Sequence, residues 1–191
     1  MAVGPFDDNA YLLRCRATGE QLLIDAAAEP DILIRLVNGS LASVFTTHQH
    51  GDHSQGLAGV VAATGARTHA GRFDAAGIPV ATDVLVEDGD KVRVGDCELT
   101  VTHIVGRTPG SMALLYDDPK GHPHLFTGDG LFPCRANRST RSASDPERPH
   151  SEIAVKIFAK LPDETWIYPG HGDDTVLGDE RARFAEPDAH R

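Results

Sequence analysis

The chain has 191 residues, which suits one domain with a buried core. Its hydrophobic fraction of 40% and charged fraction of 24% argue against a disordered or fibrous chain. Asp and Glu outnumber Lys and Arg by 28 to 18, and this net charge of −10 disfavours binding to nucleic acid or to an anionic membrane surface. No apolar run approaches the ~20 residues that a membrane-spanning helix needs.

The N-terminal residues and the cysteines indicate in which cellular compartment the protein is located. Residues 1–5 hold neither a basic patch nor an apolar stretch, so we expect no secretion signal. Cys15, Cys97 and Cys134 lie far apart and form no C-x-x-C pair, which favours reduced thiols. These features predict a cytoplasmic protein, and they predict no particular oligomeric state.

Candidate strands and helices are interleaved along the chain without an internal repeat. The expected strands, beginning with a hairpin, are 10–15, 21–25, 41–45, 67–70, 83–86, 91–94, 98–103, 111–116, 124–127 and 166–168. The expected helices are 30–37, 57–64 and 152–161. Pro30 suits a helix start, and Gly65 suits a helix end. This order predicts a single α/β layered domain over residues 1–191.

Two segments have few apolar residues. The segment 134–151 holds arginines among serines and prolines, and it cannot bury enough surface to offset the entropy lost on ordering. We expect a mobile loop there, with a basic anion-binding patch as the alternative. Residues 175–191 are charged and weakly apolar, and we expect them to form a C-terminal tail.

Three histidines and one aspartate fall within six positions directly after a predicted strand, in the sequence H-Q-H-G-D-H. Imidazoles two residues apart on an extended segment point the same way, so His48 and His50 can bind one ion. Gly51 is expected to let the backbone turn tightly, so that Asp52 and His53 face a neighbouring position. Nitrogen and carboxylate ligands together suit zinc, iron or manganese. The alternatives are a surface loop or a set of buried, hydrogen-bonded histidines.

Two further strands end in a candidate ligand. Asp129 follows the strand in L-F-T-G-D, and His171 follows the strand in I-Y-P-G-H-G. Loops that hold ligands collect at strand ends. Either residue alone is a weak signal, but beside the histidine cluster both are predicted to be metal ligands.

The motifs T-H-x-H-x-D-H, T-P-G-S, F-T-G-D-x-L-F and Y-P-G-H-G follow one another in this order. They resemble the metallo-β-lactamase fold superfamily, and within it most closely the glyoxalase II-like (hydroxyacylglutathione hydrolase-like) hydrolases. The matching segments are 47–53, 108–111, 126–132 and 168–172. The resemblance implies a four-layer αββα sandwich with a two-metal site at one edge of the sheets, where a metal acidifies a bound water for hydrolysis.

The resemblance also implies how the ligands divide between the two metals. The first metal would be bound by His48 and His50, the second by Asp52, His53 and His171, and both by Asp129. Asp52 would in addition hold the hydroxide, or take its proton if only one metal is present. We expect zinc first, with iron or manganese as alternatives.

One position departs from the family pattern. The family has a histidine directly before T-P-G-S that completes the ligands of the first metal, whereas this chain has Arg107. Arginine stays protonated and offers no lone pair, and its charge repels a nearby cation. We therefore predict one tight metal site and a second position that is weak or empty. The tight site would comprise Asp52, His53, Asp129 and His171.

Arg107 leaves its own role open. Its guanidinium could replace the charge of the missing metal and steady a developing oxyanion, which would make it a catalytic residue beside Asp52. It could instead leave the site weakly active or inactive, or its side chain could point into the solvent. His103, four residues earlier, is an alternative ligand that could swing in.

The predicted activity is hydrolysis of a small thioester, lactone or related ester. The alternative is a metal-binding pseudoenzyme or weakly active relative. Only 19 residues follow Gly172, so we expect no helical domain of the kind that recognises glutathione. The acidic charge disfavours a nuclease, the lack of an export signal disfavours a β-lactamase, and Arg107 disfavours a persulfide dioxygenase.

Overall fold

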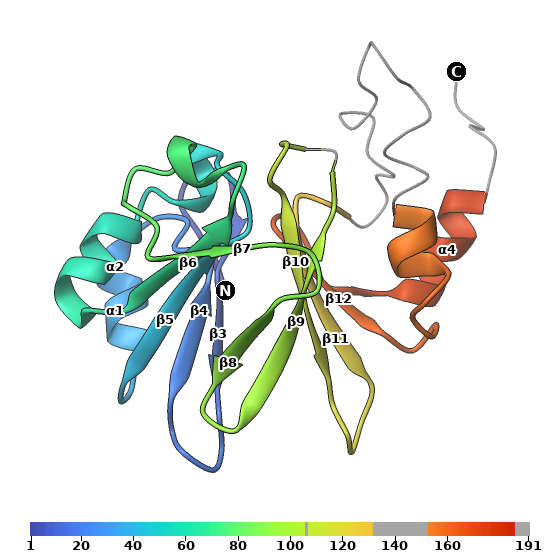
Figure 1. Cartoon of the computed structure of the whole chain (residues 1–191), viewed down its shortest axis with the longest axis horizontal. Coiled ribbons are helices and arrows are strands. Elements are labelled where there is room, and N and C mark those ends of the chain that lie inside the picture. The colour runs from blue at the N-terminus through green and yellow to red at the C-terminus, as the bar shows by residue number, and fades with distance from the viewer. Residues whose placement is uncertain (106, 132–152, 186–191) are drawn as a thin grey trace.

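The computed structural model describes residues 1–105, 107–131 and 153–185. Two β-sheets face each other, and helices cover the outer face of each (Figure 1). This is the four-layer αββα sandwich that the resemblance implies, so the predicted fold class is confirmed. The segment 134–151, predicted to be a mobile loop, lies outside the described residues.

The first sheet has the strand order β3-β4-β5-β6-β7, and all neighbours except β3 and β4 are parallel. Its strands are β3 (Tyr11–Arg14), β4 (Gln21–Ile24), β5 (Leu41–Thr46), β6 (Arg67–Gly71) and β7 (Val84–Val86). Helices α1 (Pro30–Leu36) and α2 (Leu57–Thr64) lie on its outer face. Because the sheet is covered on both sides, β4 is buried along its whole length, which explains its apolar run.

The two outer helices cross closely. A Cβ atom at Gly59 in α2 would lie 2.8 Å from the Cβ of Pro30, so a side chain there would push the helices apart. Helix α2 ends at Gly65, whose φ of 68° lies in the left-handed region and whose N–H donates to the Val61 carbonyl. Both helices therefore begin and end within one residue of their predicted bounds.

The second sheet has the order β13-β12-β11-β10-β9-β8, and only β11 and β12 are parallel neighbours. Its strands are β8 (Lys91–Val94), β9 (Cys97–His103), β10 (Met112–Asp117), β11 (Pro123–Gly128), β12 (Trp166–Pro169) and β13 (Thr175–Val176). Its outer face is covered by a π-helical turn, η4 (Ala154–Phe158), and by α4 (Leu177–Ala185). The helix expected over 152–161 thus ends at Phe158 in the structure, and residue 152 lies outside the described residues.

The C-terminal region corrects one expectation. Residues 175–185 were expected to be part of a tail, but they form β13 and α4. Leu177 is completely buried, and the Arg181 guanidinium donates to the carbonyls of Phe158 and Leu161. The prediction is wrong there because one buried leucine and a few polar contacts dock a short helix whose composition is mostly polar.

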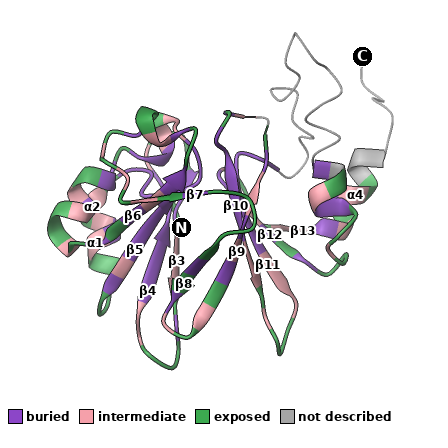
Figure 2. Ribbon diagram, in the orientation of Figure 1, coloured by how far each residue is buried: buried purple, intermediate pink, exposed green. Residues whose placement is uncertain are grey.

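The buried residues lie between the layers (Figure 2). One apolar cluster lies between the first sheet and α1 and α2, a second lies between the sheets, and a third lies between the second sheet and the C-terminal helices. In the described part of the chain, no helix is long and apolar enough to cross a membrane. A two-stranded ribbon of β1 (Ala2–Val3) and β2 (Asp8–Asn9) completes the fold.

Candidate metal centre

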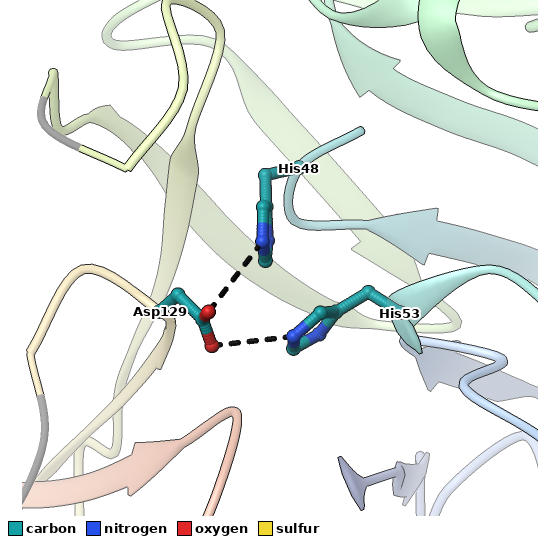
Figure 3. Close-up of side chains that lie close together, drawn as sticks. All are labelled: His48, His53 and Asp129. Atoms are coloured by element: carbon teal, nitrogen blue, oxygen red, sulfur yellow. Dashed lines mark ion pairs between the residues drawn. The ribbon is translucent and has the colours of Figure 1, made fainter. Parts of the chain in front are cut away.

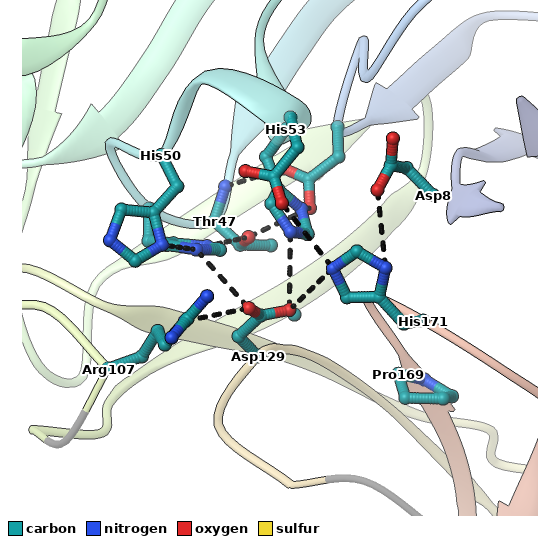
Figure 4. A network of polar contacts seen from close by, with 12 residues as sticks. Asp8, Thr47, His50, His53, Arg107, Asp129, Pro169 and His171 are labelled. Atoms are coloured by element: carbon teal, nitrogen blue, oxygen red, sulfur yellow. Dashed lines mark hydrogen bonds and ion pairs between the residues drawn. The ribbon is translucent and has the colours of Figure 1, made fainter. Parts of the chain in front are cut away.

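The loops that follow β5, β9, β11 and β12 bring the predicted site residues together at one edge of the sandwich (Figure 4). The first sheet contributes the loop with the H-Q-H-G-D-H motif, and the second contributes the other two ligands and the arginine. The side chains that meet there are His48, His50, Asp52, His53, Arg107, Asp129 and His171. The site is therefore built from both halves of the molecule.

His48 and His50 converge as the two-residue spacing predicts. His48 Nε2 lies 3.1 Å from His50 Nδ1 and 3.7 Å from Asp129 Oδ2 (Figure 3 shows the second contact). The Thr47 hydroxyl donates to Asp25, so it accepts from His48 Nδ1, and this leaves the lone pair of His48 Nε2 directed at the cluster.

Two other candidate ligands, His53 and His171, face the second oxygen of Asp129, and Asp52 faces His171. His53 Nε2 is 3.2 Å and His171 Nε2 is 3.5 Å from Asp129 Oδ1, and His171 Nε2 is 3.6 Å from Asp52 Oδ2. Among the described residues, two sets of three have ligand atoms that all lie within 4.8 Å of one another. They are His48, His53 and Asp129, and Asp52, His53 and His171.

Arg107 points into this cluster. Its Nε donates to Asp129 Oδ2 at 2.9 Å, on the oxygen that also faces His48. The alternative in which the Arg107 side chain points into solvent is thus excluded, although this side chain remains 32% exposed. Burial and the Arg107 charge together lower the pKa of His50. A fixed cation therefore lies where the ligands of the first metal would meet.

His103 does not replace the missing histidine. Its Nε2 donates to the Pro109 carbonyl at 2.8 Å, and it belongs to neither set of converging ligand atoms. The idea that His103 swings in as a ligand finds no support in its position.

The electrostatics differ between the two buried histidines. Burial acts to lower the pKa of His53, but the carboxylates of Asp25 and Asp129 raise it to about 10. Burial, reinforced by the charge of His53, lowers the pKa of His48 to about 2. Burial acts to raise the pKa of Asp129, yet the contact with His53 lowers it below its usual range. A carboxylate and neutral His48 are thus available as ligands, and His53 would lose its proton when a metal ion binds there.

The residues present fit a metal ion. His53 Nε2 is buried and has no hydrogen-bond partner among the residues that the structure describes, although it faces a carboxylate. A Cβ atom at Gly170 would lie 2.5 Å from Asp129 Oδ1 and 2.6 Å from His53 Cε1, so glycine leaves the space that the ligands need. Imidazole nitrogens with carboxylate oxygens are a donor set for zinc, iron or manganese.

Gly51 is not essential in the way we expected. Its φ is not positive, and a Cβ atom there would have no neighbour within 4 Å among the described residues. The turn that presents Asp52 and His53 comes instead from a short 3-10 helix, Gly51–His53, in which His53 N–H donates to the His50 carbonyl.

Three buried aspartates support the site, and none of them was predicted to be a site residue. Asp25, at a φ of 56°, accepts from Thr47 N–H at 2.7 Å and from His53 Nδ1 at 2.8 Å. Asp8 lies against His171 and Asp74 lies beneath the H-Q-H-G-D-H loop. The only indication of such a role in the sequence is an aspartate beside a run of apolar residues, where a charged side chain is unusual. Asp25, which directly follows an apolar strand, shows this most clearly.

Asp74 joins two segments of the site. It accepts from Gln49 N–H at 3.0 Å, from Gly110 N–H at 2.8 Å and from the Thr108 hydroxyl. Asp74→Ala is expected to lower the free energy of unfolding by about 3 kcal/mol, because it leaves buried donors without an acceptor. Urea denaturation measures this change. Exposed Asp173 provides the control, since Asp173→Ala should stay within about 0.5 kcal/mol of the unmodified protein; equal losses would contradict the assignment.

Residues 3–171 match the family model of the metallo-beta-lactamase superfamily. The chain belongs to this superfamily. The prediction of the family from four short motifs is therefore confirmed.

The chain also resembles individual members. A hydroxyacylglutathione hydrolase of Polaromonas sp. (strain JS666) is 35% identical over 182 residues, which cover 93% of this chain and 66% of that protein. One from Cereibacter sphaeroides (strain ATCC 17025) is 32% identical over 167 residues, which cover 86% and 62%. The chain thus spans 66% and 62% of the length of these two relatives.

Solved structures agree with this placement. ETHE1 from Myxococcus xanthus superposes with a TM-score of 0.81 at 28% identity and covers 97% of this chain and 81% of its own. TTHA1623, in a di-iron-bound form, superposes with a TM-score of 0.76 at 28% identity and covers 95% and 96%. Both neighbours have the fold of the superfamily to which this chain belongs.

Proposed function

We propose that this protein is a metal-dependent hydrolase of a small thioester, lactone or related ester, with one tightly bound metal. The Arg107–Asp129 ion pair carries the proposal. Because Arg107 Nε lies 2.9 Å from Asp129 Oδ2, a permanent cation occupies the side of this carboxylate that faces His48. A metal on that side would meet this charge at close range, so the tight position is on the other side of Asp129.

The tight position uses Asp52, His53, Asp129 and His171. When bound there, the metal would polarise the carbonyl of the substrate and lower the pKa of a bound water. We expect zinc, with iron as the leading alternative because TTHA1623 resembles this chain and was solved in a di-iron-bound form.

Asp52 and Arg107 are the proposed catalytic residues. The Asp52 side chain is 25% exposed and lies beside His171, so it is placed to accept a proton from an attacking water. The guanidinium of Arg107 stabilises the negative charge that develops on the carbonyl oxygen, as cationic donors do in other hydrolytic sites.

The test compares metal content with turnover. The metal is removed with a chelator, and the protein is then reloaded with zinc, iron or manganese. Each form is assayed on small thioesters, lactones and esters. A hydroxyacylglutathione serves as a comparison substrate, because relatives are named hydroxyacylglutathione hydrolases. We expect hydrolysis only after reloading, and Asp52→Asn should lower kcat by about 100-fold or more. Full activity without metal, or a loaded protein that cleaves nothing in the panel, would overturn the proposal.

A further inference from the structure

Asp8, in β2, is a completely buried carboxylate beside the metal centre. Neither of its oxygens makes a hydrogen bond within the described part of the chain, and Oδ1 lies 3.2 Å from His171 Nδ1 (Figure 4). On the other side, a Cβ atom at Gly4 would lie 3.2 Å from Oδ2, so the loop between β1 and β2 closes over the carboxylate. Burying a carboxylate is costly, which points to a specific role for this one.

The two nitrogens of His171 face different groups. Nδ1 faces Asp8, whereas Nε2 faces Asp52 at 3.6 Å and Asp129 at 3.5 Å. A neutral imidazole carries its proton on one nitrogen only. Asp8 is the nearest of the three carboxylates, at 3.2 Å, so that proton is favoured on Nδ1, and this leaves the lone pair of Nε2 directed at the cluster.

The ribbon that carries Asp8 is fixed to the turn that carries His171. Asn9 donates from its side chain to the carbonyls of Pro169, at 3.0 Å, and Gly172, at 2.8 Å. Its backbone N–H donates to the Gly170 carbonyl at 2.8 Å. Asp8 is therefore held in register with His171 by its neighbour in the sequence.

The histidines of the centre differ in what lies behind them. His53 is backed by the Asp25 carboxylate at 2.8 Å and His171 by the Asp8 carboxylate at 3.2 Å. His48 is backed by the neutral Thr47 hydroxyl, and the Nδ1 of His50 faces His48. A carboxylate partner raises the basicity of an imidazole ligand. Both carboxylate-backed histidines belong to the same side of Asp129.

We propose that Asp8 is a positioning residue that fixes His171 with its proton on Nδ1 and, together with Asp25, makes the position at Asp52, His53 and His171 the tight metal site. This inference rests on the metal centre of the proposed function. It concerns metal affinity and the placement of one proton, both of which are measured without turnover.

The first test is zinc affinity, measured by competition with a chromogenic chelator. Asp8→Asn should weaken zinc binding by about 10-fold to 100-fold, the usual cost of losing such a partner. The matched control is Asp7→Asn, which removes the same charge from an exposed side chain. The φ of 53° at this position is one that asparagine tolerates. The control should leave the affinity unchanged. Equal affinity of Asp8→Asn and the unmodified protein, or equal losses in both variants, would overturn the inference.

The second test needs no variant. Nitrogen-15 NMR of the metal-free protein should show the His171 proton on Nδ1, and a proton on Nε2 would overturn the inference even if Asp8→Asn failed to fold. In a His171→Ala background, Asp8→Asn should cause no further loss of zinc affinity, since its effect acts through this imidazole. An undiminished further loss would indicate a general structural role instead.

The two proposals fail in different ways. If Asp8→Asn weakens zinc binding but the loaded protein cleaves no substrate, the hydrolase proposal is wrong and the role of Asp8 stands. If the loaded protein is active and Asp8→Asn binds zinc normally, only the role of Asp8 is wrong.

Discussion

Arg107→His is expected to raise the metal content from about one to about two ions per chain, since it supplies the lone pair that the first position lacks. The substitution also removes the cation that donates to Asp129 Oδ2 at 2.9 Å. His48 and His50, whose nitrogens already lie 3.1 Å apart, would then form three imidazole ligands with the new side chain. Elemental analysis of protein purified with ample zinc gives the stoichiometry.

Arg107→Ala is the matched control, because it removes the charge without adding a ligand. The metal content should stay at about one ion in this variant, since two imidazoles and a shared carboxylate leave the first position incomplete. About two ions with alanine would show that the charge alone keeps the second metal out. An unchanged content with histidine would show that residue 107 is not at the open ligand position.

Gly170→Ala is expected to weaken zinc binding by about 100-fold or more. The new Cβ atom would lie 2.5 Å from Asp129 Oδ1 and 2.6 Å from His53 Cε1, closer than such atoms approach, so at least one ligand must move. Chelator competition measures the loss, and circular dichroism checks that the fold persists.

Gly51→Ala controls for the loss of a glycine at the site. In the described part of the chain, no atom lies within 4 Å of a Cβ atom placed at residue 51, and its backbone does not require a positive φ. Zinc affinity should therefore be unchanged in this variant. Normal zinc binding by Gly170→Ala would contradict the close packing that the structure places around the ligands.

The sequence predicts much of this molecule because its signals are local. The helix that Gly65 ends and the cluster that contains His48 and His53 are each encoded within a few adjacent residues. Short motifs also sufficed to place Asp129 and His171 at strand ends, although only the family resemblance indicated that these ends meet.

The supporting aspartates could not be predicted in the same way. Asp25 lies 28 positions from His53, and Asp74 lies 36 positions from Gly110, so their partners are set by the packing of sheets and loops. Asp25 also adopts a left-handed backbone conformation, which favours glycine and gives no signal at an aspartate. The helix α4 was not predicted because its composition is mostly polar, and the one leucine that packs into the core, Leu177, gives no helical pattern by itself.

The ligand loops reach this edge from opposite sheets, the one holding His53 from the first and the ones holding Asp129 and His171 from the second. An ion held between them would fasten the two halves of the sandwich across their shared seam. Zinc at a thousand times its dissociation constant would raise the free energy of unfolding by about 4 kcal/mol. The melting temperatures with and without zinc should therefore differ widely. The metal-free protein should unfold first at the edge where the ligand loops meet.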